Sequence, residues 1–132
     1  MYVSGFPRLL LRLEGLVVLT ISLYFYNELD GGWLLFALLL LAPDLSFLGY
    51  LAGPGPGSTL YNIAHSYLLP GALGVLEFML QQPLLYSIAL IWTAHIGLDR
   101  LLGYGLKYAT GFHDTHLGRI GRSNPEEEVV GQ

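Results

Sequence analysis

Long apolar stretches separated by short polar breaks dominate the chain. A helix needs about 20 mostly apolar residues to cross the ~30 Å hydrocarbon core of a membrane. Four such stretches can be drawn, over residues 7–26, 32–51, 59–80 and 83–102. The pattern therefore predicts an all-α, polytopic membrane protein built as a bundle of four transmembrane helices.

The breaks between the stretches have recognisable chemistry. Residues 27–32 are a polar turn, and residues 81–83 end in a proline suited to starting a helix. Residues 53–58, Gly-Pro-Gly-Pro-Gly-Ser, are not expected to stay helical, because proline lacks an N–H donor and glycine is entropically costly. The sequence thus predicts a transmembrane domain over residues 1–108 and a polar cytoplasmic C-terminal tail over residues 109–132.

Composition agrees with a protein whose main surroundings are a lipid bilayer. The 132 residues are 53% hydrophobic and 12% charged, whereas soluble domains carry about a quarter charged residues. The absence of cysteine excludes disulfides, thiolate metal sites, thiol catalysis and iron–sulfur clusters. A net charge of -4 offers no basic surface for nucleic acid.

Basic residues predict the orientation. Neither the break at 27–32 nor the one at 81–83 contains one. All six lie at the N-terminus or around and after the end of the fourth stretch: Arg8, Arg12, Arg100, Lys107, Arg119 and Arg122. With an even number of spans, the positive-inside rule places both termini in the cytoplasm. We expect a multi-pass protein of the cell inner (cytoplasmic) membrane.

Several ionisable residues fall in one layer of the predicted bundle. Helical rise converts sequence position into depth, about 10 Å from the cytoplasmic end for four of them and about 5 Å for the fifth. They are Glu14, Asp44, His65, His95 and, nearest the end, Asp99. An ionisable group inside a membrane is costly and suggests function by default. Their shared depth predicts one polar site facing the cytoplasm.

The spacing of these residues indicates which chemistry they share. His95 and Asp99 are four residues apart, which lets one helix present imidazole and carboxylate side by side. Asn62 and His65 share a helix face, and Asp44 follows a proline that frees backbone carbonyls. Imidazole and carboxylate together suit zinc, manganese or iron, and an incomplete protein shell leaves room for an activated water.

The polar tail adds further candidates. His113 and His116 can bind metal or fold back over the cytoplasmic mouth; the alternative is a solvated or interfacial tail. The candidate ligands of a divalent metal, zinc or manganese, are therefore Asp44, His65, His95, Asp99, His113 and His116. Glu14 is a candidate general base or outer partner of the metal ligands, and Asn62 is a second candidate catalytic residue.

Each element also has a structural interpretation. His65 can be an interhelical hydrogen-bonding group, and His95 with Asp99 can lock the bundle. Asp44 can cap a helix. Glu14 can pair with a neighbouring arginine at the membrane interface.

Five segments resemble a known family. They are Arg-Leu-Glu-Gly at 12–15, Pro-Asp-Leu-Ser at 43–46, Tyr-Asn-Ile-Ala-His-Ser-Tyr at 61–67, the stretch at 95–107 and the stretch at 111–118. Together they resemble small four-helix bacterial integral membrane proteins of unknown function, domain of unknown function 4260. This resemblance covers nearly the whole chain and names no activity.

A looser resemblance concerns the order Pro-Asp, His-Ser, then His-x-x-x-Asp. It is similar to the membrane-bound metal-dependent hydrolases, relatives of zinc phospholipase C-like enzymes. The resemblance implies attack by a bound water on a phosphoester or similar bond, in a lipid, and four metal ligands: Asp44, His65, His95 and Asp99. That family has a further His and an Arg before its His-Ser, whereas Asn62 stands nearest here. Either the metal shell is reduced, or His113 and His116 complete it, or hydrolytic activity is absent.

Two kinds of function follow. The first is a cytoplasm-facing intramembrane metal site with hydrolase chemistry on a phosphoester or lipid-like substrate. The alternative is a non-enzymatic bundle: a proton or ion relay, or an accessory subunit that holds pigment, haem or quinone, with His65 or His95 as axial ligand. A relay would need a homo-oligomer because four short helices leave little room for a pathway, whereas an accessory subunit would belong to a larger membrane complex.

Overall fold

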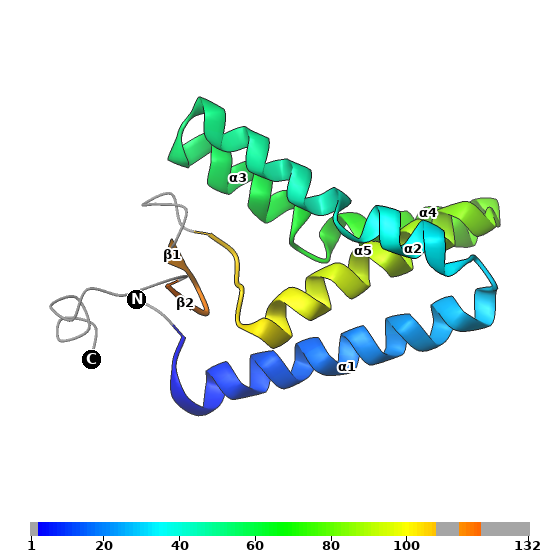
Figure 1. The fold of residues 1–132 in the computed structure, drawn as a ribbon, viewed down its shortest axis with the longest axis horizontal. Helices are drawn as coiled ribbons and strands as arrows, with labels where there is room; N and C mark the ends of the chain where they lie inside the picture. Colours follow the sequence, from blue (N-terminus) through cyan, green and yellow to red (C-terminus); the bar gives the residue numbers. More distant parts are fainter. Residues whose placement is uncertain (1–2, 108–113, 120–132) are drawn as a thin grey trace, which may run out of the picture.

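Helices make up almost all of the described structure. The computed structural model describes residues 3–107 and 114–119 (Figure 1). The elements are α1 (Gly5–Leu29), α2 (Trp33–Leu40), the 3-10 helix η1 (Ala42–Ala52), α3 (Pro54–Ala64), α4 (Leu68–Leu80), α5 (Pro83–Leu102), and the two-residue strands β1 (Asp114–Thr115) and β2 (Gly118–Arg119). The all-α expectation is confirmed for the body of the protein.

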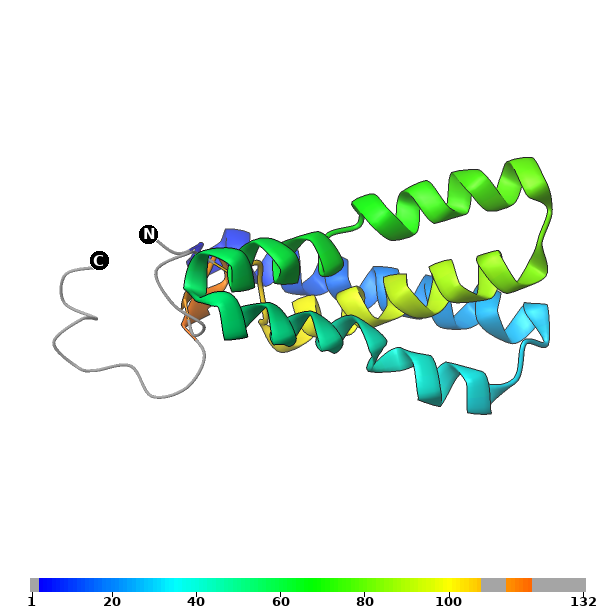
Figure 2. The ribbon, with the colours of Figure 1, turned by 90° about the horizontal axis from the view of Figure 1, so that it is seen from above.

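The elements run back and forth along one long axis (Figures 1 and 2). α1 leads away from the end that holds the β-hairpin, α2 and η1 return, α3 and α4 lead away again, and α5 returns. The backbone N–H of Val3 donates to the carbonyl of His116 at 2.8 Å. The start of the described chain and the hairpin therefore lie at the same end of the molecule.

Three helical segments are long and apolar enough to cross a membrane, which marks the chain as a membrane protein. They are Gly5–Leu29, Trp33–Ala52 and Pro54–Leu80. α5 has 20 residues but is not among them, because its polar side chains, such as His95 and Arg100, lower its hydropathy. These side chains are buried in contact with other helices. The fourth span, and with it the four-span bundle, remains a prediction.

Apolar and polar side chains are distributed as a lipid environment requires. Large apolar residues stand exposed along the body, including Leu34 at 74%, Leu68 at 79% and Phe78 at 81% exposure. Polar side chains are buried instead, including Ser22 and Ser87. Exposed apolar surface on this scale marks an interaction surface, and here it is the surface that meets lipid.

Glycines allow α5 to lie very close to α1. A Cβ on Gly15 would stand 2.6 Å from the Cβ of Arg100, and one on Gly97 would stand 2.9 Å from the carbonyl oxygen of Gly15. Small residues of this kind let helix backbones approach closely in membranes. The contact holds α5, which carries two of the predicted metal ligands, against the longest helix.

The expected break at 53–58 is wrong in its extent. Only Gly53, with φ of 115°, separates η1 from α3, and the helix begins at Pro54 rather than at residue 59. Pro54 and Pro56 lie in the first turn, where backbone N–H groups have no intrahelical partner in any case. Prolines at these positions therefore start a helix instead of stopping one.

Two predicted spans contain breaks instead of running straight. The segment from 33 to 52 changes from α2 to the 3-10 helix η1 at Leu41, next to Pro43. The segment from 54 to 80 is interrupted at residues 65–67. Irregular backbone at membrane depth is tolerated where protein satisfies it or where it lines a polar cavity. The candidate ligands Asp44 and His65 lie at these two breaks.

The described part of the polar tail packs on the helical body. β1 and β2 form an antiparallel hairpin, and Thr115 makes an isolated bridge with Lys107. Thr115 and Leu117 are fully buried. Residues 114–119 therefore fold back onto the end of the helices, one of the two behaviours expected for this region. The division of the chain at residue 109 stays a prediction.

Candidate metal centre

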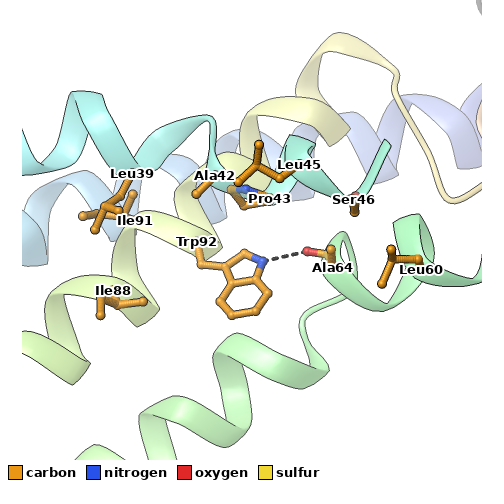
Figure 3. Close-up of a pocket in the computed structure, with 10 residues that line it drawn as sticks. All are labelled: Leu39, Ala42, Pro43, Leu45, Ser46, Leu60, Ala64, Ile88, Ile91 and Trp92. Atoms are coloured by element: carbon orange, nitrogen blue, oxygen red, sulfur yellow. Dashed lines mark hydrogen bonds between the residues drawn. The ribbon is translucent and has the colours of Figure 1, made fainter. Parts of the chain in front are cut away.

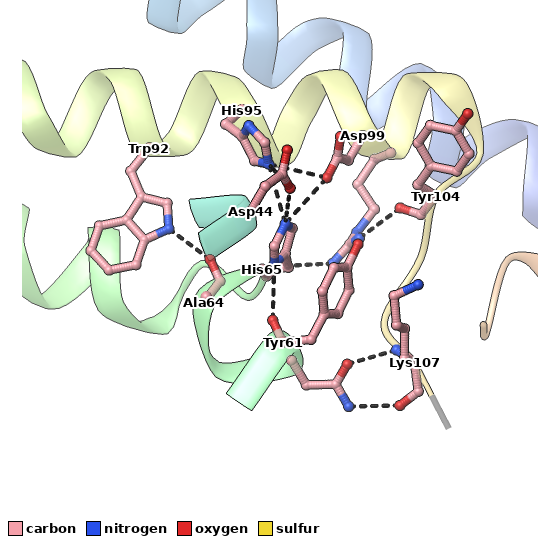
Figure 4. A network of polar contacts seen from close by, with 11 residues as sticks. Asp44, Tyr61, Ala64, His65, Trp92, His95, Asp99, Tyr104 and Lys107 are labelled. Carbon is pink, nitrogen blue, oxygen red and sulfur yellow. Dashed lines mark hydrogen bonds and ion pairs between the residues drawn. The ribbon is translucent and has the colours of Figure 1, made fainter. Parts of the chain in front are cut away.

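Four side chains from the two breaks and from α5 converge on one point (Figure 4). Each offers one ligand atom, and these atoms all lie within 4.8 Å of one another. Both imidazoles are buried, whereas the carboxylates are partly exposed. The group is Asp44, His65, His95 and Asp99. The structure thus brings together four of the six candidate ligands.

Five of the six distances within the group lie close to the edge of a tetrahedral metal shell, and all four ligand atoms lie within 4.8 Å of one another. Nε2 of His65 lies 3.1 Å from Oδ1 of Asp44 and 3.5 Å from Oδ2 of Asp99. Nε2 of His95 lies 3.2 and 3.3 Å from the same two oxygens, and the two nitrogens are 3.2 Å apart. A tetrahedral shell with ligand bonds of about 2.0–2.1 Å has edges of roughly 3.3–3.4 Å. The five distances that involve an imidazole are therefore close to the spacing that tetrahedral zinc requires.

Backbone contacts orient the two imidazole rings. Nδ1 of His65 lies 2.9 Å from the carbonyl of Tyr61, which can only accept, so Nδ1 carries the hydrogen and Nε2 presents a lone pair. The ring of His95 has a backbone hydrogen-bond partner in Leu40. Such contacts fix the tautomer of metal-binding histidines. When both rings are neutral, the lone pairs of the two Nε2 atoms and the carboxylate oxygens point at one another with no hydrogen between them. A divalent cation bound among these atoms would remove the repulsion between them.

An aromatic stack holds the ring of His65 in place. The rings of Tyr61 and His65 are stacked, with centroids 3.8 Å apart and planes 11° apart. Nζ of Lys107 lies 4.7 Å from the centroid of the Tyr61 ring. The stack restricts rotation of the imidazole and so preserves the direction of Nε2.

Two side chains of α5 satisfy the carbonyls that the break after α3 releases. Nε1 of Trp92 donates to the carbonyl of Ala64 at 2.6 Å. The buried guanidinium of Arg100 donates to the carbonyl of His65 at 2.8 Å and to that of Tyr104 at 2.9 Å. Sequence reasoning missed both roles. The sequence offered one indication of these roles. Trp92 lies three residues before the candidate ligand His95, and Arg100 directly follows the candidate ligand Asp99.

The two candidate catalytic residues lie apart from the four ligand atoms. The amide of Asn62 donates to the backbone carbonyl of Lys107 at 2.7 Å and accepts from its N–H at 2.6 Å. Asn62 therefore fastens the segment that follows α5. Glu14 is exposed on α1 and is not a member of the four-residue group. Catalytic roles for these two residues remain predictions that this geometry does not support.

The two tail histidines stand outside the group as well. Nδ1 of His116 accepts a hydrogen bond from the backbone N–H of Leu106 at 2.8 Å. Burial, and next the charge of Arg100, lower the pKa of His116, which keeps the ring neutral and able to accept. His116 thus helps to dock the hairpin. His113 lies outside the described residues.

Lys107 is expected to report on the charge of the site. Burial lowers the pKa of this single lysine to about 8, although the carboxylates of Asp99 and Asp44 raise it. Because its pKa in the folded state lies below the usual 10.5, the residue contributes stability that is gained as pH rises from about 8 to 10.5. A bound cation would neutralise the carboxylates and lower this pKa further.

Protein labelled with ¹³C-lysine would give one lysine side-chain resonance, whose shift can be followed against pH. We expect a midpoint near 8 without metal and a lower one with zinc. A midpoint near 10.5 that zinc leaves unchanged would contradict both parts of this prediction.

Fold and site together define a helical, apolar membrane protein with a His/Asp group that can hold a metal ion. The family model described as Domain of unknown function (DUF4260) matches residues 8–120. The chain belongs to this family, which confirms the resemblance inferred from its five segments. Neither a curated protein nor a solved structure matches the chain. The comparisons therefore name a family and no activity.

Proposed function

We propose that this protein holds a divalent metal ion, zinc in the first place, in an intramembrane site that faces the cytoplasm. The convergence of four electron-pair donors, with five of their six mutual distances between 3.1 and 3.5 Å, carries the proposal. Manganese is the second choice because it accepts the same ligand atoms but prefers additional oxygen ligands. Two buried nitrogens 3.2 Å apart with carboxylates beside them leave no space for a haem between them, so a haem held by both histidines gains no support.

The proposed topology has four spans with both termini in the cytoplasm of a bacterial inner membrane. The contact between Val3 and His116, which joins the two ends of the described chain, supports an even number of passes. α5 supports a fourth pass because its polar side chains face protein, so low hydropathy does not exclude it from the membrane. The distribution of basic residues gives the direction.

Single cysteines test the topology, because the natural chain has none. Ser4→Cys lies near one end of the molecule, and Gln82→Cys lies in the turn between α4 and α5 at the other. We expect a membrane-impermeant maleimide added to intact cells to label Gln82→Cys but not Ser4→Cys, and the reverse for inverted vesicles. Labelling of both positions from the same side would contradict the three passes proposed between them.

We further propose hydrolase chemistry on a phosphoester at this site. A divalent cation held there by the four side chains would supply Lewis acidity, and a water would be activated as a fifth ligand. Asp44 gives the group an open edge, since 35% of its side chain is exposed whereas the imidazole of His65 is wholly buried. The rigid ligands on α5 and His65 would hold the site, and a substrate would approach along the Asp44 edge.

Metal titration of the purified protein is the direct test. Chelated protein in detergent is expected to take up about one zinc or cobalt ion per chain, and tetrahedral cobalt to give strong visible absorption. Release of a phosphomonoester and a chromogenic alcohol from phosphodiester substrates is then measured with and without metal. No uptake of zinc, manganese or cobalt would overturn the metal site. Uptake with no hydrolysis would overturn the hydrolase proposal alone and leave the site standing.

A further inference from the structure

Lys107, the one lysine of the chain, is buried beside the metal group (Figure 4). The residue is only 3% exposed, although lysine is rarely buried in proteins. Its Nζ lies 4.7 Å from the centroid of the Tyr61 ring and 5.5 Å from that of the Phe47 ring. The Tyr61 ring stacks in turn on the imidazole of His65. One aromatic ring thus contacts both the ammonium and a ligand of the proposed metal.

Backbone contacts fix the position of Lys107 independently of its side chain. The side-chain amide of Asn62 accepts from the backbone N–H of Lys107 at 2.6 Å and donates to its carbonyl at 2.7 Å. On the other side, Lys107 forms a bridge with Thr115 of the hairpin. A substitution at position 107 therefore changes the charge there and keeps these backbone contacts.

The ammonium and a metal ion would draw on the same negative charges. Burial lowers the pKa of Lys107 to about 8, and the carboxylates of Asp99 and Asp44 oppose this by raising it. These two carboxylates are also the anionic members of the metal group. A divalent cation bound to them would leave the ammonium with less compensation and would repel it.

The other charged and titratable groups described around Lys107 do not take over this part. Arg100 of α5 is always protonated, so its charge is the same with and without metal. His116 of the hairpin accepts a hydrogen bond from the N–H of Leu106, and its pKa is lowered by burial and then by the charge of Arg100. Tyr61 contributes a phenol. Lys107 is therefore the neighbour whose charge can respond to the metal near pH 8.

The surroundings of the metal group provide little screening. An apolar cavity of about 460 Å³ adjoins the group, and none of the residues that line it is charged (Figure 3). Charges interact more strongly where the effective dielectric constant is low, and salt screens buried pairs much less than exposed ones. The ammonium and the metal ion should therefore influence each other although they share no ligand atom.

We propose that the ammonium of Lys107 competes with the metal ion for the negative charge of Asp44 and Asp99, so that the site binds metal tightly only after Lys107 has released its proton to water. This inference rests on the proposed metal site and describes its regulation. By linkage, the factor by which zinc weakens proton binding at Lys107 equals the factor by which the proton weakens zinc binding. We expect a factor of about 10, within the usual range of coupling between two sites.

The direction of the pH effect follows from the same linkage. Without zinc the pKa of Lys107 is about 8, and zinc lowers it. Zinc affinity should therefore rise with pH below about 8, where zinc binding expels the proton, and level off above it, where the proton is already lost.

Two charge variants of the full chain test the proposal. Lys107→Arg keeps a positive charge at every pH, whereas Lys107→Met never has one. Zinc affinity is measured in detergent by competition with a chromophoric chelator, from about pH 6.5 to about pH 8.5. We expect the wild type to match Lys107→Arg at the low end and Lys107→Met at the high end, with the two variants about 10-fold apart. Protonation of the ligand histidines affects all three proteins and cancels in the ratios.

Arg12→Met is the control for a change of charge at the surface. Arg12 is exposed near the end of α5, so its loss should leave the pH profile of the wild type unchanged. The same pH profile and affinity in the wild type and both Lys107 variants would overturn the inference and leave the metal site intact. Equal loss of affinity in both Lys107 variants at every pH would show a purely structural role and would overturn it as well.

The wild type alone supplies a second measurement, which does not depend on how the variants fold. The midpoint of the lysine resonance should fall on addition of zinc by the factor that separates the two limits of zinc affinity. A midpoint that zinc leaves unchanged would contradict the competition. No zinc uptake by the wild type at any pH would overturn the metal site, and the regulation with it.

Discussion

Replacing His65 or Asp99 with alanine is expected to reduce bound zinc from about one ion per chain to near zero. Each contributes one of the four ligand atoms, and neither has a neighbour in the group that can take its place. Loss of an outer partner of a metal ligand typically weakens metal binding about 10- to 100-fold, and loss of the ligand itself is expected to exceed that. Metal analysis of protein purified in parallel measures the effect.

The matched control for this series is His116→Ala. His116 is an imidazole of the same protein that lies outside the four-residue group, so this variant should keep its zinc. Thermal unfolding gives a second readout, because a ligand that binds only the folded state raises its stability. Zinc should raise the Tm of the wild type and of His116→Ala, but not of His65→Ala or Asp99→Ala. Full zinc occupancy in both ligand variants would contradict the proposed site.

The four converging residues could be chosen from the sequence because membrane burial makes ionisable side chains conspicuous. Helical rise placed Asp44, His65, His95 and Asp99 at similar depth, and depth is a property of each stretch alone. Depth does not determine the direction in which a side chain points around the helix axis. Glu14 lies at the same depth, yet it is exposed while the adjacent Gly15 faces α5. Depth predicted the layer, and packing between helices decided which residues meet in it.

The break in the third stretch was beyond sequence reasoning for a related reason, whereas Pro43 had indicated irregular backbone in the second. An interruption at residues 65–67 leaves carbonyls without helical partners, so its stability depends on donors from another part of the chain. Those donors are Trp92 and Arg100, about 30 residues later in the sequence. Asn62 illustrates the same limit, since its partner is the backbone of Lys107. Local patterns show none of these contacts.

Replacing Arg100 with methionine is expected to cause the largest loss of stability at the site. The guanidinium donates to the carbonyls of His65 and Tyr104 from within the protein, and the side chain of methionine offers neither hydrogen bond. A buried acceptor left unpaired costs about 1–3 kcal/mol, so the loss is about 2–6 kcal/mol for the pair. Arg100→Lys should restore little, because an ammonium does not reproduce the planar fork that reaches two carbonyls.

Arg12→Met is the matched control, because Arg12 also bonds a backbone carbonyl near the end of α5 but is exposed. Thermal unfolding in detergent should show a much smaller drop in Tm for Arg12→Met than for Arg100→Met. Zinc affinity should fall in Arg100→Met as well, although Arg100 is not a ligand, because the carbonyl it holds belongs to His65 itself. Equal Tm values for the two variants, with unchanged zinc affinity, would show that the break after α3 is stable without the hydrogen bond from Arg100. The position of His65 would then depend on its contacts with Tyr61 and with the other ligands, and not on the buried arginine.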